Sequence, residues 1–166
     1  DHPWIQYTLN SLAVLYWNQD RLDEARPLLE RALDSIRRTH GEEHPYTAQV
    51  MNNLGFLLLV QGDHAAARAR IERALGVQEA VLGSDHPEIA VTVLNLARLN
   101  AETGDAASAA SLYGRGIRIR EAAFGADDAS LGEPLRARAR ALRALGREAD
   151  ARAAETRADR IGDGAS

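Results

Sequence analysis

Histidine and carboxylate side chains lie next to each other at three places in the sequence, and such groupings often form metal or catalytic sites. The three places read Asp1-His2-Pro3, Glu43-His44-Pro45 and Asp85-His86-Pro87. The segment from His40 to His44 also matches the H-x-x-E-H pattern, in which two histidines of a helix bind zinc beside a catalytic glutamate. These residues are therefore the first candidates for chemistry.

The H-x-x-E-H segment lacks the setting that this zinc chemistry requires, because both histidines must share one face of a helix. Gly41 and Pro45 bracket the segment and predict a loop between two helices. The equivalent loops, VLGSDHP and AFGADDA, contain no second histidine. No P-loop, G-x-S-x-G or EF-hand pattern occurs elsewhere. We interpret the match as a coincidence, and we expect no catalytic residue, no metal and no cofactor.

The spacing of His2, His44 and His86 is 42 residues each time, which is typical of a repeat architecture. Equivalent residues of stacked repeats lie about one helix-packing distance apart, ~8–10 Å, whereas zinc ligands all lie ~2 Å from one metal. The three histidines therefore cannot converge on one ion. Proline suits the first position of a helix, and the residue before it is pushed out of helical conformation. The His-Pro pairs are thus predicted to mark helix starts.

The rest of the chain follows the same 42-residue shift, so we expect one domain, 1–166, with four repeats. The repeats cover 1–42, 43–84, 85–126 and a degenerate 127–166. Apolar residues at i, i+3, i+4 and i+7 predict two amphipathic helices in each repeat and an all-α fold. The first helices are expected over 3–19, 45–61, 87–103 and 133–145, and the second over 22–38, 65–81, 106–123 and 148–161.

Small residues recur where the two helices of each hairpin should cross. They are Ala13, Gly55, Ala97 and Ala139 on the first helices, and Ala25, Ala67, Ala109 and Ala151 on the second. Small side chains let two helices approach closely, and a larger one would overpack the contact. The turns QGDH and TGDA place glycine at a helix end and aspartate in position to cap the next helix.

Composition narrows the class of protein. The chain has 166 residues, no cysteine and a net charge of -4, and its longest apolar run is far too short to span a membrane. The negative charge argues against general nucleic-acid binding. All twenty basic residues are arginine, which we interpret as the bias of a GC-rich genome. We expect a cytoplasmic, bacterial protein without membrane contact, and, since residue 1 is not methionine, a piece of a longer chain.

The segments LNSLAVLYWNQDRLDEARPLLERAL (residues 9–33) and MNNLGFLLLVQGDHAAARARIERAL (residues 51–75) resemble tetratricopeptide repeats. The 42-residue period with its His-Pro starts is similar to the kinesin-light-chain variety, which also occurs in bacterial signalling proteins. The resemblance implies an α-α superhelix of four helix-turn-helix repeats. Glu155 and Asp159 make the last helix polar, as expected of a terminal repeat that caps the array.

The resemblance also implies that the first helices line a concave groove for a peptide or protein ligand. The groove residues carried over by register are Tyr7, Asn10, Ser11, Trp17, Gln49, Asn52, Asn53, Phe56, Asn95, Arg98, Arg136, Arg140 and Arg143. Asparagine is a poor helix-interior residue, and its amide could hold a peptide backbone. The alternative interpretation is that the asparagines are solvated or join one helix to the next.

The arginines in the first helix of the fourth repeat, expected over 133–145, suggest the chemistry of the ligand. Arg136, Arg140 and Arg143 are spaced to share one helix face, and guanidinium groups bind carboxylates or phosphates through paired hydrogen bonds. A solvated face is the other interpretation. We expect a protein or peptide ligand with an apolar anchor and an acidic portion. An alternative is a regulatory or oligomerisation array that packs in cis on other domains of a larger signalling protein.

Overall fold

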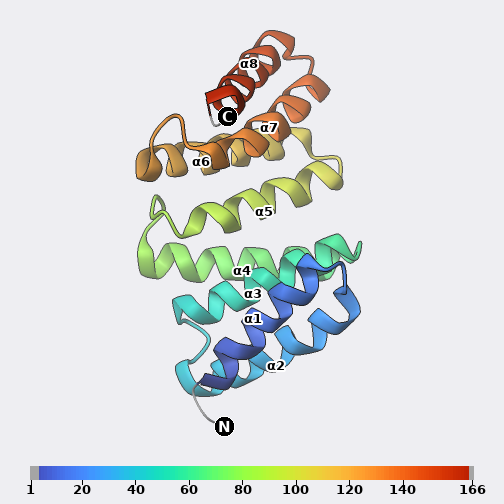
Figure 1. Ribbon diagram of the computed structural model, residues 1–166, viewed down its shortest axis with the longest axis vertical. Helices are drawn as coiled ribbons and strands as arrows, with labels where there is room; N and C mark the ends of the chain where they lie inside the picture. The colour runs from blue at the N-terminus through green and yellow to red at the C-terminus, as the bar shows by residue number, and fades with distance from the viewer. Residues whose placement is uncertain (1–3, 165–166) are drawn as a thin grey trace. The chain divides into compact units, whose positions relative to one another are not determined.

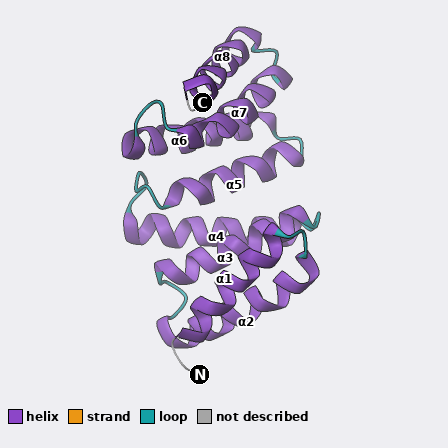
Figure 2. Cartoon of the chain, in the orientation of Figure 1, coloured by secondary structure: helices purple, strands orange, loops and turns teal. Residues whose placement is uncertain are grey.

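The structure is a computed structural model that describes residues 4–164 (Figure 1). Side chains are described for residues 4–162. The described chain is helical with no strand (Figure 2), which confirms the predicted all-α fold of helical hairpins. The first helix-start signal, Asp1-His2-Pro3, lies outside the described residues. The helices are α1 (Trp4–Asn18), α2 (Leu22–His40), α3 (Pro45–Val60), α4 (His64–Leu82), α5 (Ile89–Glu102), α6 (Ala106–Phe124), the short 3-10 helix η1 (Ala129–Leu131), α7 (Gly132–Ala144) and α8 (Glu148–Gly164).

The helices form two compact units, 1–84 and 85–166, and each unit contains two helical hairpins. In the first unit α1 pairs with α2 and α3 with α4, and α2 also packs on α3. The second unit repeats this arrangement, with α5 on α6, α7 on α8, and α6 on α7. The repeat boundaries predicted at residues 42, 84 and 126 all fall in the loops between hairpins.

Side chains that precede α3, α4 and α6 cap the N-termini of these helices. His44 is extended (φ -89°, ψ 137°), its Nδ1 accepts a hydrogen bond of 3.1 Å from the Tyr46 backbone N–H, and Pro45 begins α3. Asp63 and Asp105 cap α4 and α6 by accepting backbone N–H bonds at 3.1 and 3.0 Å. The His44-Pro45 pair therefore stabilises the beginning of α3, as the spacing predicts. At the next pair His86 Nδ1 likewise accepts a hydrogen bond of 3.3 Å from the Glu88 backbone N–H, but α5 begins only at Ile89, two residues after the predicted start at Pro87.

Close approach of the two helices in a hairpin depends on small side chains. A Cβ atom on Gly55 of α3 would lie 3.3 Å from the backbone oxygen of Ala67 and 2.7 Å from Cγ1 of Ile71, both on α4. All the predicted alanines at these crossings are fully buried. The small-residue contact is thus confirmed, and it sets the distance between α3 and α4.

The last hairpin has an apolar inner side and a charged outer side. Ala151, Ala158 and Ile161 of α8 are buried with the α7 residues Leu135 and Leu142. The outer side of α8 is charged and exposed, with 68% of the Asp159 side chain and 72% of the Arg152 side chain accessible.

Candidate binding surface on the first helices

In the first unit, the predicted groove residues meet as pairs between α1 and α3. Tyr7 stacks on Tyr46 with ring centroids 4.5 Å apart and an interplanar angle of 21°. Further along, Trp17 stacks on Phe56 at 4.5 Å and 23°. Facing side chains on these two neighbouring helices therefore fill each other's space.

The asparagines of this unit differ from one another in what they can offer a ligand. The Asn53 amide donates a hydrogen bond of 3.0 Å to the Asn10 side-chain oxygen, so this pair joins α1 to α3. Asn52 was expected on the groove, but only 3% of it is exposed, because it lies one position, about 100° of helix rotation, away from Asn53. Among the predicted polar groove residues of this unit, Ser11 and Gln49 are exposed. Ser11 and Gln49 thus remain available to hydrogen-bond a ligand, whereas Asn10 and Asn53 hydrogen-bond to each other.

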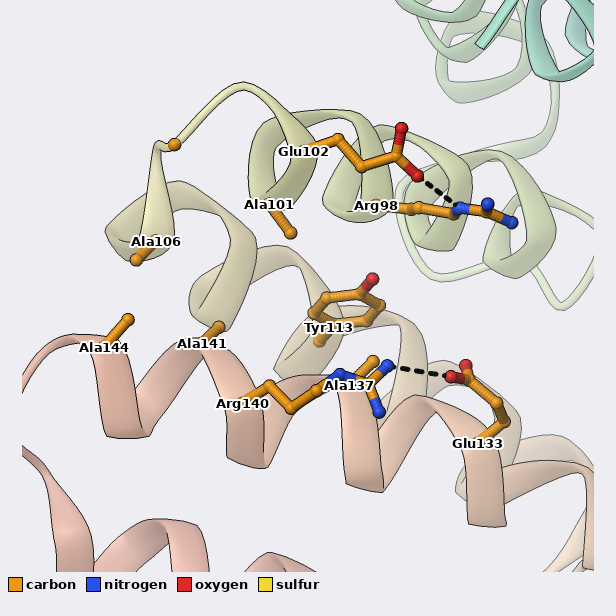
Figure 3. A pocket seen from close by; sticks show the side chains of 11 residues that line it. Arg98, Ala101, Glu102, Ala106, Tyr113, Glu133, Ala137, Arg140, Ala141 and Ala144 are labelled. Atoms are coloured by element: carbon orange, nitrogen blue, oxygen red, sulfur yellow. Dashed lines mark hydrogen bonds and ion pairs between the residues drawn. The ribbon is translucent and has the colours of Figure 1, made fainter. Parts of the chain in front are cut away.

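In the second unit, the first helices α5 and α7 and the start of α6 enclose a cavity of about 630 Å³ (Figure 3). Five small side chains form much of its apolar wall: Ala101, Ala106, Ala137, Ala141 and Ala144. Of the predicted groove residues, Arg98 and Arg140 line the cavity, whereas Asn95, Arg136 and Arg143 do not. The lining thus combines an apolar wall with convergent polar groups, which is a common composition of binding sites.

Two ion pairs and one phenol supply the polar groups of this cavity. The Arg98 Nε lies 2.8 Å from Glu102, and an Arg140 guanidinium nitrogen lies 3.0 Å from Glu133. The Tyr113 side chain lies between these pairs, with its hydroxyl directed into the space (Figure 3). Burial, and then the charge of Glu133, raise the pKa of Tyr113 to about 12. The phenol therefore keeps its proton at neutral pH and can both donate and accept a hydrogen bond.

The cavity exists because side chains are missing at positions that the first unit fills. A shift of 84 residues places Ala141 where α3 has the fully buried Leu57, and Ala101 where α1 has Trp17. Arg140 likewise replaces Phe56, the stacking partner of Trp17. Sequence reasoning missed Ala101, Ala141 and Tyr113 as site residues. The signal that could have revealed them is this loss of side-chain volume between equivalent repeats.

The arginines of α7 share one side of the helix, as predicted, but the surface is not a bare cationic one. Arg136 pairs with Asp159 at 3.2 Å, and Arg143 donates two hydrogen bonds, of 3.0 and 2.8 Å, to Glu155. The Arg143 hydrogen bonds lower the pKa of the Glu155 carboxyl. Acidic residues of α8 thus neutralise this end of α7.

The His40–His44 segment does not have the geometry of a zinc-protease helix. His40 is the last residue of α2 and His44 caps the next helix, so the two are not on one helix face. His40 Nδ1 lies 2.7 Å from the Thr39 hydroxyl, and Glu43 pairs with Arg73. Within residues 4–164, no cluster of three or more metal-binding side chains occurs. In the same region, no helix has the length and apolar character needed to cross a bilayer.

Helical hairpins that recur every 42 residues, with two of them packed together in each unit, define a helical repeat protein. The chain belongs to the tetratricopeptide repeat family, whose model matches residues 4–80 and, in an overlapping match, 46–122. Tetratricopeptide repeats are generally modules for protein–protein interaction, and proteins built from them are typically scaffolds rather than enzymes.

Solved structures with the same fold include proteins of the kinesin-light-chain type. BtubC (BKLC) from P. vanneervenii is 25% identical with a TM-score of 0.84, and the match covers 96% of this chain and 63% of BtubC. The chain thus spans less than two thirds of that protein. The nearly identical TPR-like repeats of a Podosopora anserina putative kinesin light chain share the fold at 23% identity and a TM-score of 0.73, with 99% and 78% covered. MamA shares it at 16% identity and a TM-score of 0.68, with 97% and 80% covered. None of the curated proteins compared with the chain matches it.

Proposed function

We propose that this chain is a non-enzymatic interaction module that binds a peptide or partner segment along its first helices. The observation that supports the proposal best is the cavity between α5, α6 and α7, which lies on the helices predicted to line the groove. Its alanine wall would take an apolar anchor side chain of the ligand. Removing such a side chain from water contributes about 1.5–3 kcal/mol. We further propose that all four repeats act as one domain in the cytoplasm.

The two ion pairs at the cavity determine how an acidic portion of the ligand would bind. Two arginines and two glutamates line the space, so its formal charge is zero, and a ligand carboxylate must replace a glutamate rather than meet a free cation. The Arg140–Glu133 pair suits such an exchange, since 64% and 74% of the two side chains are exposed. Exposed pairs contribute only about 0–1 kcal/mol, so little is lost when Glu133 is displaced.

Peptides selected by phage display on the full chain test this proposal, followed by calorimetric titration of the selected peptides. Replacement of Ala141 by Leu fills the cavity, and the fold tolerates Leu at the equivalent position, because α3 already carries Leu57 there. We expect this Ala141→Leu variant to bind at least about tenfold more weakly, the equivalent of one lost anchor. Arg140→Glu should weaken only those peptides that carry a carboxylate.

Ala153→Leu is the matched control, because Ala153 is an exposed alanine on the last helix, away from the cavity. It adds the same side chain and should leave the affinity unchanged. Selected peptides that bind Ala141→Leu as tightly as the original chain would contradict the cavity as the binding site. Failure to select any peptide, together with binding of a domain of the parent protein, would favour the regulatory alternative.

A further inference from the structure

The cavity of the second unit contains a hydroxyl group that the described chain leaves without a hydrogen-bond partner. Tyr113 of α6 is only 6% exposed, and its ring packs in the core of this unit. Its hydroxyl points into the cavity (Figure 3) and forms no hydrogen bond with any residue that the structure describes. A buried polar atom without a partner costs free energy, so a ligand that supplies the partner gains binding energy at this point.

Equivalent repeats show that packing alone does not require this hydroxyl. A shift of 42 residues places Tyr113 where α4 has Ile71, and a second such shift places it where α2 has Leu29. Both aliphatic side chains are fully buried. The third repeat therefore introduces a polar atom at a position that is apolar in the first two. It does so beside Ala101 and Ala141, where the second unit has lost side-chain volume.

The Tyr113 side chain lies between an apolar part and a charged part of the cavity lining. On one side of its ring lie the alanines Ala101, Ala106, Ala141 and Ala144, and on the other side lie the charged groups of the two ion pairs (Figure 3). A ligand group that occupies the alanine side and extends towards the ion pairs therefore passes the phenol hydroxyl. A polar atom of the ligand at that point can form a hydrogen bond with it, whereas a carbon atom cannot.

The charged residues around the phenol do not remove its ability to select a ligand. Arg98 pairs with Glu102 on α5 and Arg140 pairs with Glu133 on α7, so the formal charges that line the cavity add up to zero. Because burial raises the pKa of Tyr113 to about 12, its hydroxyl is protonated and uncharged at neutral pH. Such a hydroxyl can donate to a ligand oxygen or accept from a ligand N–H or O–H group. A purely apolar group in the same place would leave it unpaired, and binding sites discriminate strongly against such groups.

We propose that Tyr113 determines the specificity of the cavity, and that its hydroxyl selects a ligand group with an apolar body and a hydrogen-bonding tip over a hydrocarbon group of the same shape. Alcohols, phenols and amides are groups of the selected class. The inference rests on the proposed function, because it takes the cavity as the binding site, and it adds the chemical class of the group that enters. The acidic portion of a ligand is a separate feature, which would bind at the exposed pair of Arg140 and Glu133.

Small aromatic fragments test this selection directly, because they can enter the cavity without a peptide. The probes are p-cresol and toluene, which have the same apolar body and differ only in the hydroxyl group. Titration of the isotope-labelled full chain with each fragment, followed by the NMR chemical shifts of backbone amides, gives the two dissociation constants and their ratio. The ratio is compared between the original chain and Tyr113→Phe, so that the different hydration of the two fragments cancels.

We expect both fragments to shift the amides of residues that line the cavity. The preference for p-cresol over toluene should fall about three- to tenfold in Tyr113→Phe, which is the range of one hydrogen bond between neutral groups. Ala141→Leu fills the cavity and should remove these shifts for both fragments. Tyr16→Phe is the matched control, because Tyr16 is a partly buried tyrosine of α1 that does not line the cavity, and it should leave the ratio unchanged.

Two results would overturn the proposal, and they differ in what they mean for the proposed function. If both fragments bind in the cavity with the same ratio in Tyr113→Phe as in the original chain, the hydroxyl selects nothing, although the cavity still serves as a binding site. If neither fragment binds in the cavity, or if Ala141→Leu leaves their binding unchanged, the cavity does not accept an anchor group at all. That second result contradicts the selection by Tyr113 and the proposed anchor site together.

Discussion

Replacing Gly55 by Ala tests whether the contact between α3 and α4 is limited by side-chain volume. The added Cβ would lie 2.7 Å from Cγ1 of Ile71, 3.1 Å from Cβ of Arg70 and 3.3 Å from the carbonyl oxygen of Ala67. Carbon atoms normally pack at ~3.5–4.0 Å, so the overlap with Ile71 is about 1 Å. Ile71 is fully buried, so moving it aside displaces other packed side chains.

Two opposing terms determine the size of the effect. Overpacking of a well-packed contact costs about 1–3 kcal/mol. Alanine is better than glycine in a helix by about 1 kcal/mol, which offsets part of that cost. Gly76 separates the two terms, because it also lies inside a helix but has no atom within 4 Å of an added Cβ. Gly76→Ala should therefore gain the propensity alone, and the two variants should differ in unfolding free energy by about 1–3 kcal/mol.

Urea unfolding followed by circular dichroism measures this difference. The midpoint should fall for Gly55→Ala relative to Gly76→Ala, with the same dependence of the free energy on urea for both variants. Equal midpoints would refute the reasoning, because they would show that α3 and α4 can move apart at no cost. A changed slope would instead show that the helical hairpins unfold separately, as happens in repeat arrays.

Two further predictions concern ionisation. Since burial raises the pKa of Tyr113 to about 12 in the folded chain, the free energy of unfolding should be independent of this group below pH 10 and should decrease between pH 10 and pH 12. Urea unfolding at pH 8 and at pH 11 should show a smaller decrease for Tyr113→Phe. Carbon-detected NMR titration should find a pKa for Glu155 below its ordinary value, and Arg143→Gln should return it towards that value, because Arg143 supplies the hydrogen bonds. An unchanged Glu155 titration in that variant would contradict the pairing.

Local signals in the sequence are sufficient to predict the helical hairpins. A 42-residue period, proline at a helix start and aspartate after a glycine turn each act over a few residues, and the structure has His44, Asp63 and Asp105 as caps. The small-residue positions also follow from sequence, since a crossing of two helices repeats with the period. These features need no knowledge of which hairpin lies next to which.

The site was predicted less well, because its properties depend on distant residues. Glu155 follows Arg143 by twelve positions and lies on another helix, so its neutralising effect does not appear in the arginine pattern of α7 alone. Asn52 and Asn53 are consecutive, yet one is buried and the other bonds to Asn10, since one residue of helix turns a side chain by about 100°. A residue assigned to the groove by register can therefore be buried instead, if it lies at the edge of the helix face.

Comparison of the two units explains why we propose the second unit as the binding site. Each unit has the same two hairpins, and the same register position is occupied by Trp17 in the first and by Ala101 in the second. The indole of Trp17 stacks on Phe56 and contributes to the contact between α1 and α3, whereas Ala101 and Arg140 leave space between α5 and α7. A ligand can gain binding energy only where the protein has not already filled the space with its own side chains. The first unit therefore uses this surface for its own packing, while the second unit keeps the cavity in which we propose that the ligand binds.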